Sequence, residues 1–185
     1  MPKIFSKNDK ILRKVAAEVP IENIKSEKIQ KIIADMREVL AREEDGVAIA
    51  APQVGAALRI FIISGKVLKM KEAREKIKEK DKTLDSDDVV SPDLIFINPE
   101  ITKTSKTAKL MEEGCLSVRW WYGEVRRAVK ATIRAFDEDG KIFTRGASGL
   151  MAQIFQHEID HLNGILFTDK AKKLRETPPP NEEKA

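Results

Sequence analysis

The only two histidines of the chain lie four residues apart in the segment Gln-His-Glu-Ile-Asp-His-Leu at residues 156–162. On a helix this spacing directs both imidazole rings from one face toward a single divalent ion. Glu158 follows the first histidine and would act as a general base toward water bound to that ion. A shuffled chain of this composition contains the pattern about once in a thousand sequences. The segment therefore predicts a metal site with hydrolytic chemistry.

A third protein ligand is needed, and its type separates the enzyme classes that share this motif. The chain has no third histidine, and the glutamates after His161, namely Glu176, Glu182 and Glu183, lie next to or within a proline-broken tail. Cys115, the single cysteine, lies upstream, and its thiolate would complete the set and leave a fourth position for water. A lone cysteine is more often a small buried hydrophobe, but beside an incomplete histidine pair we expect a ligand.

The metal motif needs a helix to position it, and Ser148–Asn163 is expected to be that helix. An earlier amphipathic helix is predicted over Ser26–Glu44, where apolar residues recur with a period near 3.6. Strand-like runs cover Arg59–Ser64 and Leu94–Asn98, and two more between Gly123 and Arg145 flank a turn at residues 137–140. These elements predict an α+β fold, with antiparallel strands packed around a C-terminal metal-binding helix and with an N-terminal amphipathic helix.

Length and charge bound the remaining possibilities. The chain has 185 residues, enough for one core, so we expect a single catalytic domain at 1–176 with a charged insertion at 65–92 and a disordered tail at 177–185. The net charge of +4 is local to Lys66–Lys80, where interleaved glutamates favour a solvated helix face over a nucleic-acid stripe. Short apolar runs and a start without a signal-peptide core predict a cytoplasmic protein with no membrane or DNA partner.

Three separated motifs of the chain resemble those of the bacterial-type peptide deformylases. The family pattern Gly-x-Gly-Leu-Ala-Ala-x-Gln appears at residues 46–53, Glu-Gly-Cys-Leu-Ser appears intact at 113–117, and Gln-His-Glu-x-Asp-His-Leu appears intact at 156–162. The resemblance covers most of the chain apart from the insertion and the tail. It implies hydrolysis of the formyl group from the N-terminal formylmethionine of new polypeptides, with release of formate.

The resemblance also implies roles for single residues. Cys115, His157 and His161 would bind one divalent ion, often Fe²⁺ in this family, with Zn²⁺, Ni²⁺ or Co²⁺ also able to occupy the site. Glu158 would be the general base and then the acid, with metal-bound water as the nucleophile.

Other implied roles concern the substrate, which would be an N-formylmethionyl peptide. The side-chain amide of Gln53 and the backbone N–H of Leu116 would hold the formyl oxygen. The substrate-binding residues implied in the same way are Gly46, Val47, Ala48, Glu113, Gly114, Leu150 and Ile154.

The chain departs from the family pattern at three places. Ala48 stands where the family usually has its second glycine, so its backbone would be strained at positive φ or its methyl group would narrow the cleft. Residues 120–122 bring three of the ten aromatics together, and we hypothesise that at least one lines the mouth of the cleft and contacts substrate beyond methionine. The basic C-terminal helix used by some members for ribosome docking is short here, so transient ribosome contact would fall to Lys66–Lys80.

Two other functions remain open at this point. One is a metallopeptidase or other amidase that uses the same hydrated ion. The other is a structural metal protein, such as a ribosome-associated binding module without turnover. Structural zinc sites are normally closed by four protein ligands, so the free fourth position and the adjacent Glu158 favour an enzyme.

Overall fold

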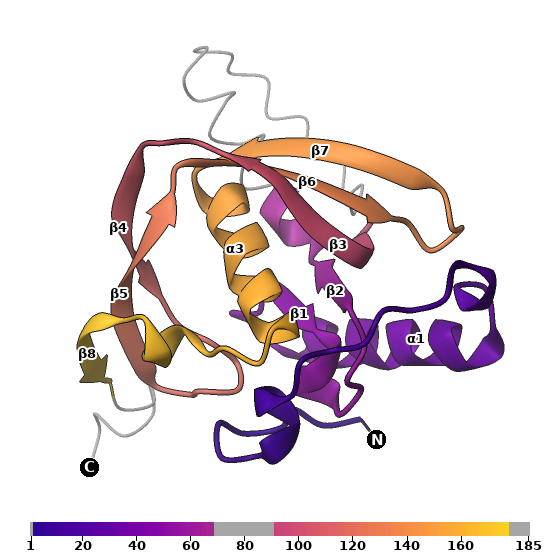
Figure 1. The fold of residues 1–185 in the computed structure, drawn as a ribbon. Coiled ribbons are helices and arrows are strands. Elements are labelled where there is room, and N and C mark those ends of the chain that lie inside the picture. The colour runs from indigo at the N-terminus through magenta and orange to yellow at the C-terminus, as the bar shows by residue number, and fades with distance from the viewer. Residues whose placement is uncertain (1, 69–90, 178–185) are drawn as a thin grey trace, which may run out of the picture.

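The computed structural model describes residues 2–68 and 91–177. Two helices and eight strands account for most of its regular structure (Figure 1). The helices are α1 (Glu27–Arg42) and α3 (Leu150–Leu162). The strands are β1 (Ala48–Ala50), β2 (Ile60–Ile63), β3 (Leu94–Thr104), β4 (Ala108–Glu113), β5 (Trp121–Ala128), β6 (Lys130–Phe136), β7 (Ile142–Ser148) and β8 (Lys172–Glu176). Short 3-10 helices are η1 (Lys10–Arg13), η2 (Ile21–Asn23), η3 (Ala51–Val54) and η4 (Phe167–Asp169).

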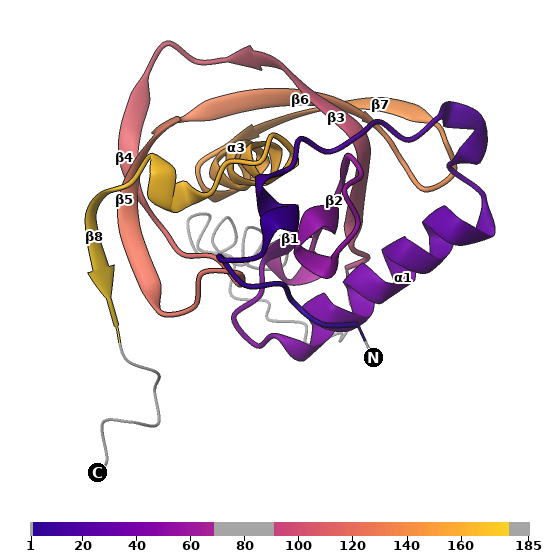
Figure 2. The same cartoon turned by 60° about the horizontal axis from the view of Figure 1, so that its bottom comes forward.

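The strands form two antiparallel sheets around α3. The larger sheet has the order β1-β2-β3-β6-β7, and the smaller has the order β4-β5-β8. Figure 2 looks nearly along α3, with β3, β6 and β7 arching over the helix and β4 and β5 beside it. The helix contacts strands of both sheets, which confirms the expected α+β fold with a C-terminal helix inside antiparallel strands.

Helix α3 is hydrophobic on the side that faces the larger sheet. Met151, Ala152, Ile154 and Phe155 are buried against strands of that sheet. The helix ends at Leu162, Asn163 caps it, and Gly164 follows with φ of 73°. A Cβ atom at Gly164 would lie 2.7 Å from the carbonyl oxygen of Arg13, so both the backbone conformation and the close approach require glycine there.

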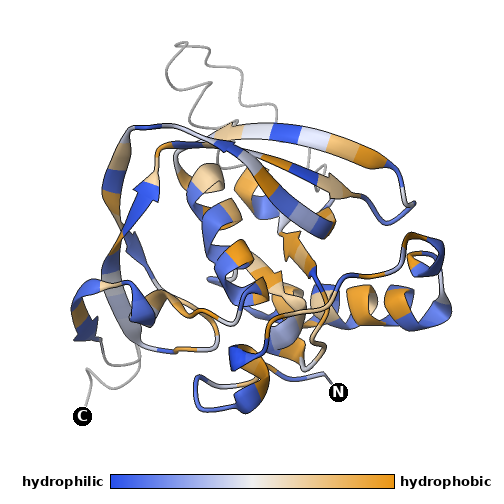
Figure 3. Cartoon of the chain, viewed as in Figure 1, coloured by the Kyte–Doolittle hydropathy of each residue, from blue (hydrophilic) through white to orange (hydrophobic). Residues whose placement is uncertain are grey.

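Helix α1 supports the strand that carries residues 48–50. Ser26 caps it by accepting a hydrogen bond from the Ile29 backbone N–H. Its apolar stripe packs against isoleucines of β1, β2 and β3, and Figure 3 shows this amphipathic alternation along α1 beside the uniformly hydrophobic β2. The predicted helix over Ser26–Glu44 is therefore confirmed, with slightly shorter bounds.

The strands differ in three respects from the sequence-based expectation. Strand β3 continues past Pro99 to Thr104 instead of ending at Asn98. The run that starts at Gly123 contains two strands, β5 and β6, which belong to different sheets. Strands β4 and β8 were not expected. All of β8 and half of the residues of β4 are exposed, so neither shows the period-two hydrophobic alternation of a half-buried strand.

Part of the expected organisation falls on residues outside the described ranges. These are most of the insertion at 65–92 and nearly all of the tail at 177–185. Of the charged helix predicted over Lys66–Lys80, only residues 66–68 are described, and these are helical. The domain limits at those points stay predictions. Within residues 2–68 and 91–177, no helix is long and apolar enough to cross a membrane.

Phe96 joins α3 to the larger sheet, and its truncation should destabilise the protein strongly. Its ring is fully buried, stacks on Phe61 at 4.5 Å and meets Phe155 of α3 edge-on at 5.4 Å. Because the cavity cannot collapse among these rings, we expect Phe96→Ala to lower the free energy of unfolding by about 3–5 kcal/mol. Urea denaturation measures this directly. Ile142→Ala, at a residue of the same sheet that is 61% exposed, should change the free energy of unfolding little. If the two variants were destabilised equally, Phe96 would not join α3 to the sheet.

Candidate functional site

Cys115, His157 and His161 meet at one point beside α3. Their potential ligand atoms all lie within 4.8 Å of one another, and Cys115 Sγ is 3.2 Å from His161 Nε2. Both histidines come from consecutive turns of α3, and Cys115 comes from the loop after β4. One thiolate and two imidazoles form a donor set that suits several first-row divalent ions. The structure therefore brings together the three residues selected from the sequence.

The thiol and the imidazoles influence one another's protonation. Burial alone would raise the pKa of the Cys115 thiol, but the charges and hydrogen bonds of His161 and His157 outweigh it and hold the pKa well below its ordinary value. Burial would lower the pKa of His157, yet its bonds to Cys115 and Glu113 hold it well above the usual range. These shifts favour the thiolate form of Cys115, which is the form that binds metals, and metal binding would displace the histidine proton.

Glu158 lies beside this cluster with a carboxylate oxygen that has no protein partner. Its side chain is only 3% exposed, and within residues 2–68 and 91–177 no hydrogen-bond donor reaches Oε2. Burial raises the pKa of Glu158, although His157 and His161 oppose the shift. A buried carboxylate oxygen without a partner is unfavourable unless the site binds something there, so this atom fits a bound ion and its water.

Gln53 points its amide nitrogen at the cluster. The backbone N–H of Ala50 donates to Gln53 Oε1 at 2.8 Å, and an N–H group requires an oxygen acceptor, so the orientation of the amide is fixed. Gln53 Nε2 then lies 3.1 Å from Ser117 Oγ and 3.5 Å from Cys115 Sγ. Gln53 is placed by η3, directly after β1.

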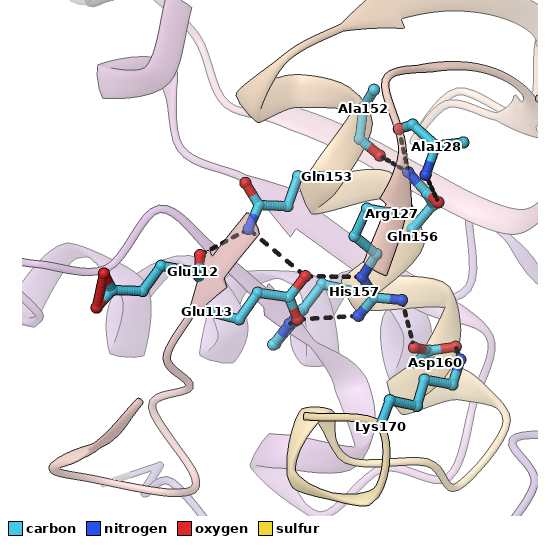
Figure 4. A network of polar contacts seen from close by, with 10 residues as sticks. All are labelled: Glu112, Glu113, Arg127, Ala128, Ala152, Gln153, Gln156, His157, Asp160 and Lys170. Carbon is cyan, nitrogen blue, oxygen red and sulfur yellow. Dashed lines mark hydrogen bonds and ion pairs between the residues drawn. The ribbon is translucent and has the colours of Figure 1, made fainter. Parts of the chain in front are cut away.

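A buried ion-pair network supports His157 from behind (Figure 4). Arg127 donates two hydrogen bonds to Glu113, of 2.7 and 2.9 Å, and a third of 2.6 Å to Asp160. Glu113 Oε2 is also 2.9 Å from Nδ1 of His157, and Lys170 Nζ donates to Asp160 at 2.6 Å. Because Nδ1 of His157 is engaged by a carboxylate, its Nε2 is the nitrogen left to bind a metal.

Glu113 stays ionised in this network. Burial alone would raise its pKa, but hydrogen bonds and charge from Arg127 and His157 outweigh burial and lower the pKa of Glu113 to about 2. The carboxylate is therefore charged at any pH at which the protein would function. Sequence reasoning assigned to Glu113 only a contact with the substrate, and it missed the role of its carboxylate.

Arg127, Asp160 and Lys170 were not singled out from the sequence. Asp160 lies inside the histidine motif, so a signal was present there. Arg127 has a weaker signal, because it is in phase with Val125 and Gly123 on the inward face of β5. Its partners come from β4 and α3, and this pairing of distant segments cannot be deduced from local patterns.

An open cleft of about 290 Å³ leads to the cluster. Glu158 and Gln53 lie in its wall, while His161 is 1% exposed and lies behind it. Ala48 has extended backbone within β1, so the expectation of a strained backbone at positive φ is wrong. Ala48 lines the cleft, in agreement with the other expectation, that its methyl group narrows it. The cleft contains every other site residue expected from the sequence, namely Gly46, Val47, Glu113, Gly114, Cys115, Leu116, Leu150, Ile154 and His157.

The aromatic segment also reaches this cleft. Trp120, Trp121 and Tyr122 all line it and all are partly exposed. The prediction that at least one of them lies at the cleft is confirmed. That any of them contacts substrate stays a prediction.

Comparison with known proteins agrees with these motifs. A protein-family model described as polypeptide deformylase matches residues 1–177. A peptide deformylase of Mesorhizobium japonicum is 35% identical over 90% of this chain and 82% of its own length. The chloroplastic peptide deformylase 1A of Solanum lycopersicum is 38% identical over 92% of this chain. The match covers 59% of that relative's own length. The actinonin-bound class I type b peptide deformylase of Acinetobacter baumannii superposes with a TM-score of 0.74 at 28% identity, covering 93% of this chain and 99% of that one.

Removing the guanidinium of Arg127 should destabilise the protein, because Glu113 and Asp160 would lose the buried positive charge that they share and three hydrogen bonds. We expect Arg127→Met to lower the free energy of unfolding by about 3–5 kcal/mol, as measured by urea denaturation. The matched control is Arg126→Met, because Arg126 is the exposed neighbour on the same strand. If both variants were as stable as the unmodified protein, the network would not support the site.

Proposed function

The chain belongs to the peptide deformylase family, and we propose that it hydrolyses the N-formyl group of N-formylmethionyl peptides and releases formate. The observation that carries this proposal is the arrangement at the end of the cleft. A buried carboxylate with a free oxygen and an oriented amide nitrogen flank one cysteine and two histidines. Hydrolysis of a formyl group needs a base that takes a proton from the attacking water and a donor that holds the formyl oxygen, and these two groups would fill those roles.

The family is metal-dependent, and we propose that Cys115 Sγ and the Nε2 atoms of His157 and His161 hold one divalent ion. When bound, such an ion lowers the pKa of water and polarises a carbonyl oxygen. The carboxylate of Glu113 would accept a hydrogen bond from Nδ1–H of His157. This keeps the proton on Nδ1 and leaves Nε2 free for the metal. Arg127 would in turn keep Glu113 ionised and in place.

Glu158 would move the proton. Its free Oε2 would accept a proton from the attacking water and later deliver it to the departing amine nitrogen. The pKa of Glu158 is raised by burial, which brings the group closer to the range in which a carboxyl group exchanges protons efficiently near neutral pH. Its burial also excludes bulk water from this transfer.

Gln53 and Leu116 would hold the formyl oxygen. Negative charge develops on that oxygen in the transition state, and donors aimed at it stabilise the transition state more than the substrate. The amide of Gln53 is already oriented by Ala50 and Ser117, and its second N–H, which lies toward Cys115 Sγ with a nitrogen–sulfur distance of 3.5 Å, would turn to the formyl oxygen. The backbone N–H of Leu116 would supply the second donor.

The methionine side chain would enter the apolar part of the cleft. Ile154 is buried, Leu150 is 40% exposed, and both lie on the helix face that carries the histidines. Val47 and Glu113 also line the cleft. A flexible thioether suits such a pocket. Gly46, Ala48 and Gly114 would contact the substrate beside these residues.

New polypeptides carry the formyl group, so we propose a cytoplasmic setting with only transient ribosome contact. The metallopeptidase alternative is disfavoured, because it would leave the presence of the Gln53 and Cys115 motifs unexplained.

Replacing Glu158 should stop the reaction without emptying the metal site. We expect Glu158→Gln to release formate from formyl-Met-Ala about 10²–10⁴-fold more slowly, with one metal ion per chain retained by elemental analysis. Glu176→Gln, at an exposed position outside the cleft, should behave like the unmodified protein, and acetyl-Met-Ala should not be hydrolysed. Rapid turnover by the metal-loaded Glu158→Gln variant would refute the assigned role.

We propose Fe²⁺ as the native ion, and oxygen tests this choice. Iron-loaded protein should lose activity in air, because the ion is oxidised or Cys115 advances along the sulfur oxidation ladder. Nickel-loaded protein, measured in parallel on the same peptide, should keep its activity. Equal activity of the iron form after aerobic and anaerobic purification would count against iron.

A further inference from the structure

Two of the three aromatic residues in the cleft wall, Trp121 and Tyr122, make packing contacts that account for an aromatic side chain at their positions. Trp121 packs against a buried cluster that includes Val118, Val125 and Phe167. The ring of Tyr122 covers Gly114 so closely that a Cβ atom there would lie 2.8 Å from it. Trp120, in contrast, joins none of the hydrophobic clusters formed by residues 2–68 and 91–177.

The backbone of Trp120 is also strained. Its φ is 65°, in the left-handed region that a bulky residue rarely adopts. The Thr177 backbone N–H donates to its carbonyl oxygen at 2.7 Å and holds the conformation. Strained residues of this kind are concentrated at ligand-binding sites. A tryptophan that lies outside the packed core, costs conformational energy and lines the cleft is best explained by a ligand.

Arg119 fixes the tryptophan ring at the edge of the cleft. Its guanidinium lies 5.7 Å from the centre of the Trp120 ring. The same guanidinium donates to both carboxylate oxygens of Asp45, at 3.1 and 3.0 Å, and pairs with Glu43. The positive charge of Arg119 is therefore neutralised within the protein.

Other charges at the cleft mouth are paired as well. Glu112, which lines the cleft, pairs with Arg175. Because Arg119 faces two carboxylates, the charged groups around Trp120 offer no positive charge to an acidic substrate residue. The aromatic surface is what remains for a ligand at this part of the wall.

We infer that Trp120 determines specificity for the peptide that follows the N-terminal methionine, and that it favours an aromatic or large apolar side chain there. The inference rests on the proposed function. With the formyl group at the Cys-His-His cluster and methionine against Val47, Leu150 and Ile154, the next residues pass along the wall formed by 118–122. Aromatic pairs add enough stabilisation to favour such a substrate about three- to ten-fold.

The test compares kcat/KM of the metal-loaded protein for formyl-Met-Ala-Ala, formyl-Met-Phe-Ala and formyl-Met-Ala-Phe. At one of the two positions, phenylalanine should be preferred about three- to ten-fold over alanine. Trp120→Gly should bring this ratio close to one, and Trp120→Phe should preserve the preference. Lys173→Gly is the matched control, because Lys173 has φ of 50° at an exposed residue outside the cleft and its replacement should leave the ratio unchanged.

Thermal unfolding separates this role from a structural one. Glycine relieves the left-handed strain, so Trp120→Gly should melt no lower than the unmodified protein. A lower melting temperature with an unchanged substrate ratio would overturn the inference and make Trp120 structural. Formate release without any phenylalanine preference would overturn the inference alone. Absence of formate release from all three peptides would overturn the proposed function, and this inference with it.

Discussion

Arg127 places a permanent positive charge inside the protein, and the surrounding structure is arranged so that this charge is tolerated. A buried guanidinium must keep its carboxylate partners, since a buried charge without a partner is strongly destabilising. Glu113 at the end of β4 and Asp160 on α3 are those partners. The smaller sheet and the central helix are therefore held in one relative position by charge pairing, whereas the larger sheet holds α3 by apolar packing.

This constraint reaches the reactive end of the cleft through a single side chain. Glu113 satisfies Arg127 and His157 together, so the orientation of the imidazole follows from the position of β5. Two residues further along the chain, Cys115 completes the cluster. The inner end of the cleft is thus positioned by largely buried contacts. The mouth is different, because Arg119, Asp45 and Trp120 are held by pairs that are partly exposed to solvent.

How much could be predicted from sequence depended on whether the signal was local. The signals for the histidine pair on a helix, the periodicity of α1 and the end of α3 next to Asn163 lie in adjacent residues. The structure has the first two and ends α3 at Leu162, one residue before the predicted end. The partnership of Arg127 with Glu113 and Asp160 joins segments 14 and 33 residues away, so no local pattern revealed it. Strand β8 forms from exposed, largely charged residues, because pairing with β5 and not hydrophobic alternation defines it.

The central claim is that buried charge pairing presents one sulfur and two nitrogen atoms to a divalent ion and leaves the next position open. X-ray absorption spectroscopy of the zinc-loaded protein tests it most directly. The account predicts one sulfur at about 2.3 Å, two imidazole nitrogens at about 2.0–2.1 Å and one oxygen from water, with the sulfur lost in Cys115→Ser. A shell without sulfur, or one closed by four protein ligands, would contradict it.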